Sequence, residues 1–319
     1  MGNEVMVSIF CTAYNQEEYI ADAIESFLMQ KTNFKYEIIV HDDASTDKTA
    51  DIIRKYKKSY PKIVQAIFQS ENQYSKNVNI FEDFMLPIAN GKYIAICEGD
   101  DYWTDALKIQ KQVDILEKNI GCDICAHTAR VVNAKSKREI RKIMPSKTDT
   151  HFSLEEVING DGGFVATNSL MLRKDIFEKP TPKFREKYRI DYSLQIMGSL
   201  RGGMIYLSEC MSSYRVFAKS SWTNKMISNT DLFVSHYLKM ISMLETLDQE
   251  TTGRFHEIII QKIKNQEFEI LKVKQQYKEL FSKEYKSIFN SLPINEKAKI
   301  YIKLLCPWSV SIRKMRINK

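Results

Sequence analysis

Two adjacent carboxylates, Asp100 and Asp101, are the residues whose types and spacing suggest chemistry most directly. The sequence from Tyr93 to Trp103 reads YIAICEGDDYW, which predicts a buried strand ending in a turn that Gly99 permits. Adjacent carboxylates repel, and a hard divalent cation relieves the repulsion while leaving positions for a substrate's phosphates. An acidic turn after a core strand is the alternative, since Asp and Gly are ordinary turn residues.

Strands and helices alternate through the first part of the chain. Apolar runs predict strands at 5–13, 36–41, 63–68 and 93–97. Apolar residues at helical spacing predict helices at about 20–28, around 52–56 and at about 80–89. Such alternation favours right-handed crossovers and a mostly parallel sheet with helices on both faces. The predicted fold class is therefore α/β, with a mostly parallel, Rossmann-like sheet.

Polar loops follow three of these strands. The loops are Thr12-Ala13-Tyr14-Asn15, Asp42-Asp43 and Asp100-Asp101. Ligands of such sheets bind at the carboxyl ends of the strands, so the three loops are expected to converge on one crevice and form a site. The sequence has neither a GxxxxGK[ST] nor a GxGxxG loop, so a bound nucleotide would need a metal ion to neutralise its diphosphate.

The later part of the chain mixes strand and helix patterns. The sequence predicts a helix at 107–119, a strand at 123–132, a polar basic loop at 133–150, and strands at 164–172 and 204–207. Asp191 heads a helix that runs to about residue 200, and spacing alone slightly favours a structural role for an acid in that first turn. Helical spacing beyond about residue 223 predicts a helical region, so the expected domains are 1–222 and 223–319.

The net charge of +7 is concentrated at the end of the chain. Residues 291–319 contain seven Lys or Arg and one Glu, or +6, which leaves about +1 for the rest. Without a basic face, nucleic acid is not a predicted partner. No apolar run reaches the roughly 18 residues of a membrane span and no signal peptide is evident, which predicts a cytoplasmic location. The CxxC pair Cys122 and Cys125 lies in an apolar run, which favours core packing over zinc.

The chain resembles the family 2 glycosyltransferases, which have the A-type nucleotide-sugar transferase fold, over about residues 5–222. The resemblance rests on VSIFCTAYN at 7–15, HDDASTDKT at 41–49, EGDDYW at 98–103, and the later Asp191 and Tyr214-Arg215. It is greatest to bacterial enzymes that build capsular or O-antigen polysaccharide. It implies a nucleotide-sugar-binding catalytic domain at 1–222 and a helical region with a basic amphipathic tail at 223–319.

The resemblance also implies roles for individual residues. Asp43 is expected to bond the nucleotide base, most often uracil, and Asp100 to lie near the ribose. Asp101 is expected to ligate Mn²⁺ or Mg²⁺, and Asp191 to deprotonate the acceptor hydroxyl. Further donor contacts are implied for Thr12, Ala13, Tyr14, Asn15, Glu17 and, at the diphosphate, Lys76. Acceptor or supporting positions are Trp103, Thr167, Asn168, Tyr214 and Arg215.

The implied activity is a metal-dependent transfer of sugar from a nucleoside diphosphate-sugar, most often a UDP-sugar, to a saccharide or lipid-linked acceptor. The metal ion would stabilise the departing diphosphate, and a single carboxylate base implies one displacement with inversion. Phe217 stands where many relatives have a His, so the resemblance does not supply a second protein ligand from this loop.

Two other functions and two uses of the tail stay open. A sugar nucleotidyltransferase would be expected to have a glycine-rich basic loop after the first strand, which Thr12-Ala13-Tyr14-Asn15 is not. A non-catalytic scaffold subunit would be expected to lose the acids, which are all present. The apolar and basic residues at 300–319 suit either peripheral contact with an anionic membrane, where lipid-linked acceptors reside, or an interface with another subunit.

Overall fold

The computed structural model describes residues 4–76, 78–218 and 229–305. The chain divides into two compact units, Met1–Lys225 and Met226–Lys319. The domain boundary predicted after residue 222 and most of the predicted basic tail, residues 306–319, lie outside the described residues.

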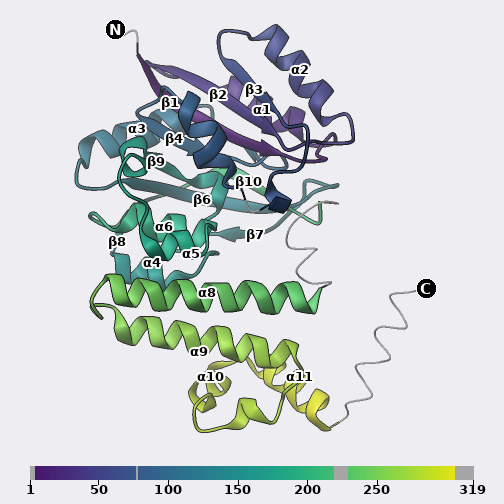
Figure 1. Cartoon of the computed structure of the whole chain (residues 1–319), viewed down its shortest axis with the longest axis vertical. Helices are drawn as coiled ribbons and strands as arrows, with labels where there is room; N and C mark the ends of the chain where they lie inside the picture. Colours follow the sequence, from purple (N-terminus) through teal and green to yellow (C-terminus); the bar gives the residue numbers. More distant parts are fainter. Residues whose placement is uncertain (1–3, 77, 219–228, 306–319) are drawn as a thin grey trace. The chain divides into compact units, whose positions relative to one another are not determined.

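One ten-stranded sheet with flanking helices forms the first unit (Figure 1). Its strands are β1 Val5–Ala13, β2 Lys35–Asp42, β3 Val64–Phe68, β4 Tyr93–Ile96, β5 Tyr102–Trp103, β6 Ile124–Asn133, β7 Glu139–Ile143, β8 Thr150–Phe152, β9 Met171–Arg173 and β10 Met204–Val216. Its α-helices are α1 Ile20–Leu28, α2 Thr49–Ser59, α3 Lys108–Lys118, α4 Leu154–Gly160, α5 Lys183–Lys187 and α6 Asp191–Ser199. The main strand order is β3-β2-β1-β4-β9-β6-β10-β5, with β7 on β6 and β8 on β10.

The first four strands of that order form the parallel half of the sheet. β1 pairs in parallel with β2 and β4, and β2 pairs in parallel with β3. Interior residues such as Ile9, Val40 and Ala95 are fully buried, as expected of strands covered on both faces. The register places Ala13 opposite Asp42, so the loops after β1 and β2 start side by side. The α/β prediction is confirmed.

The second half of the sheet is mixed. β9 is antiparallel to both β4 and β6, whereas β6 and β10 are parallel. The strand predicted at 164–172 is reduced to β9, because Thr167–Ser169 forms the 3₁₀ turn η4, in which Ser169 Oγ donates to the Ala166 carbonyl at 2.6 Å. The segment predicted as a loop at 133–150 contains β7, which pairs antiparallel with β6.

Two more segments differ from their predictions. The strand predicted at 204–207 continues through Val216 as β10, because polar residues that interrupt its apolar pattern, such as Ser212 and Ser213, are buried and bonded inside the sheet. The helix predicted at 80–89 is a π turn at Phe81–Met85 followed by a 3₁₀ turn at Leu86–Ile88. Pro87 lacks the N–H that a regular helix would use there.

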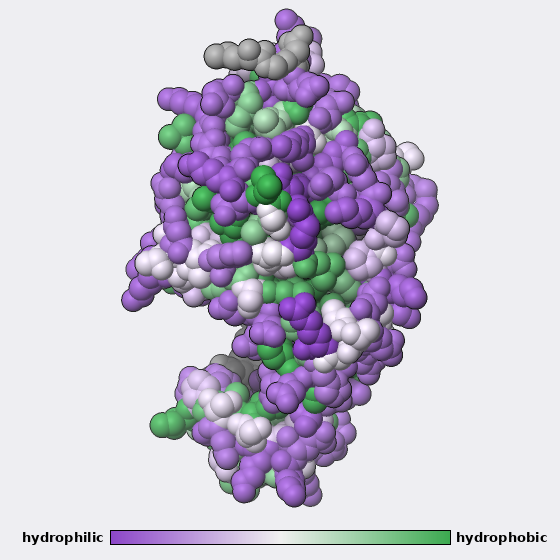
Figure 2. Space-filling model, turned by 90° about the vertical axis from the view of Figure 1, so that its left-hand side faces the viewer, coloured by the Kyte–Doolittle hydropathy of each residue, from purple (hydrophilic) through white to green (hydrophobic). Residues whose placement is uncertain are grey.

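The described part of the second unit is helical. Its elements are α8 Thr230–Glu250, α9 His256–Val273, the 3₁₀ turn η6 Glu279–Phe281, α10 Lys286–Ser291 and α11 Ile294–Leu305. A small core joins α9, α10 and α11 through Phe268, Phe289 and Ile300. Among the described residues, no helix is long and apolar enough to cross a membrane. The face shown in Figure 2 is mostly hydrophilic, with apolar residues in small separate groups.

A lysine without exposed surface lies in the core of the first unit. Lys108, on α3, donates to Gln112 Oε1 at 2.7 Å, and its Nζ lies 3.9 Å from the centroid of the Trp103 ring. Burial lowers the pKa of Lys108 from 10.5 to about 7, because desolvation disfavours the charged amine.

We predict that Lys108→Met changes the pH dependence of stability. Between about pH 7 and 10.5 the unfolded chain protonates this lysine more than the folded chain does, so wild-type stability should rise with pH, by at most about 1.4 kcal/mol per unit. The free energy of unfolding of Lys108→Met should lack this contribution. Urea denaturation at several pH values measures this pH dependence of the free energy of unfolding. The control is Lys118→Met, at an exposed site on the same helix. Parallel pH curves for wild type and Lys108→Met would contradict the prediction.

Candidate active site

The turn after β4 holds its two aspartates differently. Asp101 is 1% exposed, and its Oδ1 accepts from the Arg215 backbone N–H at 2.7 Å while its Oδ2 accepts from Asn168 Nδ2 at 2.8 Å. Asp100 is partly exposed. The direct metal-ligand role predicted for Asp101 stays a prediction, and a metal ion there would share each oxygen with a protein donor. Asp100 is the carboxylate of the pair that is open to a ligand.

Asn168 connects the acidic turn to β10. Its side chain is fully buried, donates to the Ser213 carbonyl at 3.1 Å and accepts from Ser212 Oγ at 2.7 Å. Its own carbonyl accepts from Trp103 Nε1 at 2.9 Å. Trp103 is 1% exposed and packs edge-on against Phe27. Asn168 and Trp103 therefore support the site from behind, and neither has the exposed surface that a contact with an acceptor would need.

Arg215 holds the backbone of the same turn. Its buried guanidinium donates to the Asp100 carbonyl at 2.7 Å, forms an ion pair with Asp22 of α1, and lies 4.4 Å from the Tyr102 ring centroid. Tyr214 is partly buried beside it on β10. The sequence analysis missed Asp22. Its position in the first turn of α1 is that of an ordinary surface acid, and no local pattern pairs it with Arg215.

Asp191 is the first residue of α6 and reaches the same site. Thr167 Oγ1 donates to Asp191 Oδ2 at 2.5 Å. The residue is exposed, yet the surrounding protein limits hydration of the carboxylate and so raises its pKa, against the opposing effects of the Thr167 bond and Arg185. The predicted residues Thr167 and Asp191 thus lie together.

Glu98 shows that these acids form one cluster. Burial raises the pKa of Glu98, and the next largest contributions come from the charges of Asp191, then Asp100 and Asp101. The turn after β4 and the start of α6 are therefore close enough for the charges of their carboxylates to affect one another. Glu98 was not among the predicted site residues, although its place at the end of a buried strand was a usable signal.

The loops after β1 and β2 are bonded into one platform. Asn15 N–H donates to Ser45 Oγ at 2.9 Å, and Lys48 N–H donates to Glu17 Oε2 at 3.0 Å. Within this platform Ala13 is buried, whereas Thr12 and Tyr14 are partly exposed. The platform also touches the acidic turn, since Gly99 N–H donates to the Thr12 carbonyl at 2.9 Å.

Gly99 suits this close approach. A Cβ built at Gly99 would lie 2.4 Å from Gln16 Oε1 and 2.8 Å from Ile20 Cδ1. A larger residue would therefore require the ends of the Gln16 and Ile20 side chains to move, so glycine lets the acidic turn and the platform approach each other without that adjustment.

Two predicted nucleotide contacts are engaged within the protein. Asp43 is 3% exposed, and its two oxygens accept from the backbone N–H groups of Gln73, at 2.7 Å, and Tyr74, at 3.1 Å. Bonding of Asp43 to a nucleotide base would require these bonds to be released or shared. Lys76 is exposed in the same loop and forms an ion pair with Glu71.

The acids of the turn suit a metal ion that binds together with a ligand such as a substrate's phosphates. Within 4–76, 78–218 and 229–305, no group of three or more His, Cys, Asp or Glu could hold a metal ion. Mg²⁺ and similar ions, however, are often bound through one or two carboxylates together with a substrate's phosphates and water. Asp100, partly exposed among repelling acids, suits that kind of site.

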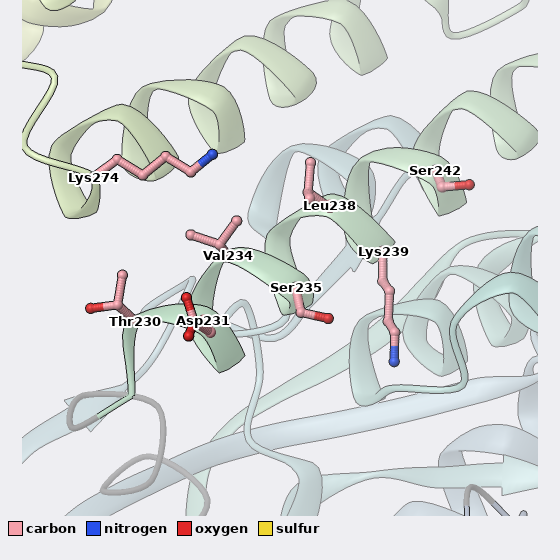
Figure 3. A pocket seen from close by; sticks show the side chains of 8 residues that line it. All are labelled: Thr230, Asp231, Val234, Ser235, Leu238, Lys239, Ser242 and Lys274. Atoms are coloured by element: carbon pink, nitrogen blue, oxygen red, sulfur yellow. The ribbon is translucent and has the colours of Figure 1, made fainter.

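Two cavities lie elsewhere in the described chain. One of about 560 Å³ runs along α8 in the second unit, with Lys274 at the end of α9 reaching over it (Figure 3). It has a single carboxylate, Asp231. The other, of about 750 Å³, lies at the amino ends of β1 and β4, where Lys92 is paired with Glu117 at 2.6 Å. The second cavity is lined by three acids, Glu4, Asp175 and Glu178, and by three bases, Lys92, Arg173 and Lys174, so its charges are mixed.

Residues 8–180, more than half of the chain, match the family described as Glycosyl transferase family 2. The chain belongs to this family. Membership makes it a glycosyltransferase, which favours a transferase over the nucleotidyltransferase and scaffold alternatives.

Relatives and solved structures agree with this family. The uncharacterized protein Rv1520 of Mycobacterium tuberculosis is 32% identical over 76% of this chain and 67% of its own length. WfaP of Escherichia coli, a UDP-Glc:alpha-D-GlcNAc-diphosphoundecaprenol beta-1,3-glucosyltransferase, is 41% identical over 35% of this chain and 41% of WfaP. The crystal structure of S. aureus TarS 1-349 with UDP-GlcNAc has a TM-score of 0.58 and 15% identity, covering 92% of this chain and 78% of TarS 1-349. That likeness confirms the A-type fold.

The two aspartates of the turn should differ in their effect on stability. Asp100→Asn removes a charge from the acidic cluster and leaves both carboxylate oxygens of Asp101 in place. In the absence of metal, it should leave the free energy of unfolding unchanged or raise it. Asp101→Asn also removes a charge, but it turns an amide NH₂ toward one of the two donors, so this variant should be less stable than Asp100→Asn by about 1–3 kcal/mol. Urea denaturation in EDTA compares the two. Equal losses would show that the hydrogen bonds of Asp101 do not support the turn.

Proposed function

We propose that this glycosyltransferase is metal-dependent and inverting, and that it moves a sugar from a UDP-sugar to a lipid-linked saccharide during synthesis of a bacterial surface polysaccharide such as capsule or O-antigen. One observation carries the proposal. Glu98 and Asp100, at the end of β4, and Asp191, at the start of α6, form a single acidic cluster beside the platform of the β1 and β2 loops.

The donor end of the site is the platform. Thr12 and Tyr14 are partly exposed on it, and the hydrogen bonds between its two loops hold it in shape before any ligand arrives, which lowers the entropic cost of binding. The names of two similar proteins support a uridine nucleotide: WfaP uses UDP-Glc, and TarS was solved with UDP-GlcNAc.

Asp100 is the proposed metal ligand, and Asp101 is its support. The Asp101 carboxylate, held by Arg215 and Asn168, keeps the turn in place so that Asp100 stays partly exposed. A bound Mn²⁺ or Mg²⁺ would act as a Lewis acid that stabilises the charge on the leaving diphosphate. Because the protein offers few ligands, we expect the metal and the nucleotide to bind together.

Asp191 is the proposed general base. Thr167 holds one carboxylate oxygen, which leaves the other to accept the proton of the acceptor hydroxyl. The raised pKa of Asp191 makes its carboxylate a stronger base than that of an ordinary aspartate. One base and one displacement give inversion at the anomeric carbon.

The lipid-linked acceptor is proposed from WfaP, whose name specifies a diphosphoundecaprenol-linked saccharide. The match to WfaP covers only 35% of this chain, so the sugar and linkage of that protein are not carried over.

Nucleotide binding should depend on both metal and Asp100. Calorimetric titration of UDP should give binding with Mn²⁺ and little or none in EDTA, and Mn²⁺ titrated alone should bind weakly, because Asp100 lacks enough protein co-ligands. Asp100→Asn should remove most of the metal-dependent binding. Exposed Asp51 on α2 provides the control Asp51→Asn. Equal UDP affinity with Mn²⁺ and with EDTA would overturn the metal role, and preference for another nucleoside diphosphate would change the donor.

Asp191→Asn should separate chemistry from binding. The variant should bind UDP and Mn²⁺ like the wild type but lose at least about a hundredfold in transfer, because the general base is gone. In the wild type, transfer should fall as the pH drops through the raised pKa of Asp191. Release of UDP from UDP-sugars in the presence of lipid-linked saccharides measures the rate. Retained transfer in Asp191→Asn would require a different base.

A further inference from the structure

One helix of the second unit has two apolar faces. On α11, Ile300 is buried in the small core with Phe268 and Phe289. A second set of apolar residues, absent from that core, is exposed on the same helix: Ile294, Ala298, Tyr301, Ile302 and Leu305. At 3.6 residues per turn this second set falls within about 100° of the helix circumference. It forms a continuous stripe, which we call the α11 stripe.

The α11 stripe is strongly exposed. Ile294 is 85% exposed, Ile302 56% and Leu305 75%. Tyr301 lies at one edge, where its ring contacts Phe281 and Phe289, so the helix is anchored to the unit while the stripe faces away from its core. Exposed apolar residues that line up along a helix, rather than being scattered, indicate a surface that contacts something else.

Lysines flank the stripe. On the helical wheel Lys297 lies on one side and Lys299 on the other, and Lys303 is a third base on the same helix. The one acid of α11 is Glu296, which pairs with Lys299 at 2.5 Å. The sequence after α11 adds Arg313, Lys314, Arg316 and Lys319 and no acid.

We infer that the α11 stripe docks this glycosyltransferase on an anionic lipid surface. Apolar side chains flanked by lysines are the combination that an interfacial helix uses, with the apolar residues entering the acyl boundary and the lysines meeting the headgroups. The inference deepens the proposed function, since a lipid-linked acceptor is presented at such a surface, but docking itself does not require transfer to occur.

A second copy of the chain suits the stripe less well. Two α11 stripes packed together would bring Lys297 and Lys299 of both copies to one interface, and like charges oppose that association. An anionic surface neutralises the same lysines. The positive charge therefore favours lipid over self-association.

Vesicle flotation tests the inference. The full chain should bind vesicles of phosphatidylcholine mixed with phosphatidylglycerol, bind phosphatidylcholine alone much more weakly, and dissociate as salt rises. The double variant Ile302→Gln with Leu305→Gln, which keeps the net charge, should reduce the partition coefficient at least about tenfold. A matched control changes Ile120 and Ile140, which are 73% and 53% exposed in the first unit, to Gln and should bind like the wild type.

Three results would overturn the inference. The first is wild-type protein that binds neither kind of vesicle. The second is equal vesicle binding by the two double variants, which would assign binding to other residues. The third is a wild-type dimer that the Ile302→Gln, Leu305→Gln variant converts to a monomer in light scattering, which would make the stripe a protein interface.

The inference and the proposed function can fail separately. With a detergent-dispersed acceptor, the Ile302→Gln, Leu305→Gln variant should transfer sugar at the wild-type rate, because none of the residues of the acidic cluster is on α11. Vesicle binding without transfer to any acceptor would leave docking intact and refute the proposed reaction. Transfer of sugar without vesicle binding would support the proposed reaction and refute docking on lipid.

Discussion

The site depends on how the carboxylate of Asp101 is held. Asp101 is buried beside Glu98 and Asp100, so its charge is both desolvated and opposed by like charges. A buried carboxylate in that position costs several kcal/mol unless donors meet its oxygens. The Arg215 N–H and the Asn168 amide are those donors. They join the end of β4 to β10 and to the η4 turn, and the partly exposed position of Asp100 follows from this junction.

The two halves of the sheet contribute differently to the site. The parallel half supplies the loops that face a ligand, because the carboxyl ends of β1, β2 and β4 lie at one edge. The mixed half supplies most of the support: Asn168 precedes β9, Arg215 lies on β10, and Thr167 orients Asp191 from η4. The acidic turn and the platform thus lie at the edge of the parallel half, and residues of the mixed half form hydrogen bonds to the turn and to Asp191.

Much of the fold could be predicted from local patterns, and the errors have physical causes. The strands β1 to β4 are short, mostly apolar segments, so their pattern is visible without tertiary context. β10 was cut short because buried Ser212 and Ser213 resemble loop residues until Asn168 and the sheet provide their hydrogen bonds. η4 was read as strand because its apolar neighbours hid the local turn bonds. The pairing of β7 with β6 could not be seen in a polar, basic segment.

For the site, the sequence by itself determined which residues gather: the acids after β4, the loops after β1 and β2, and Asp191 at the head of a helix, together with the family to which they belong. Only the tertiary structure decided which of those residues are buried and bonded to the protein and which are exposed. Asp100 and Asp101 are adjacent and chemically identical, so no local rule separates them. The groups that donate to Asp101 belong to Asn168 and Arg215, which lie 67 and 114 positions away along the chain. The exposure of a side chain depends on such distant partners.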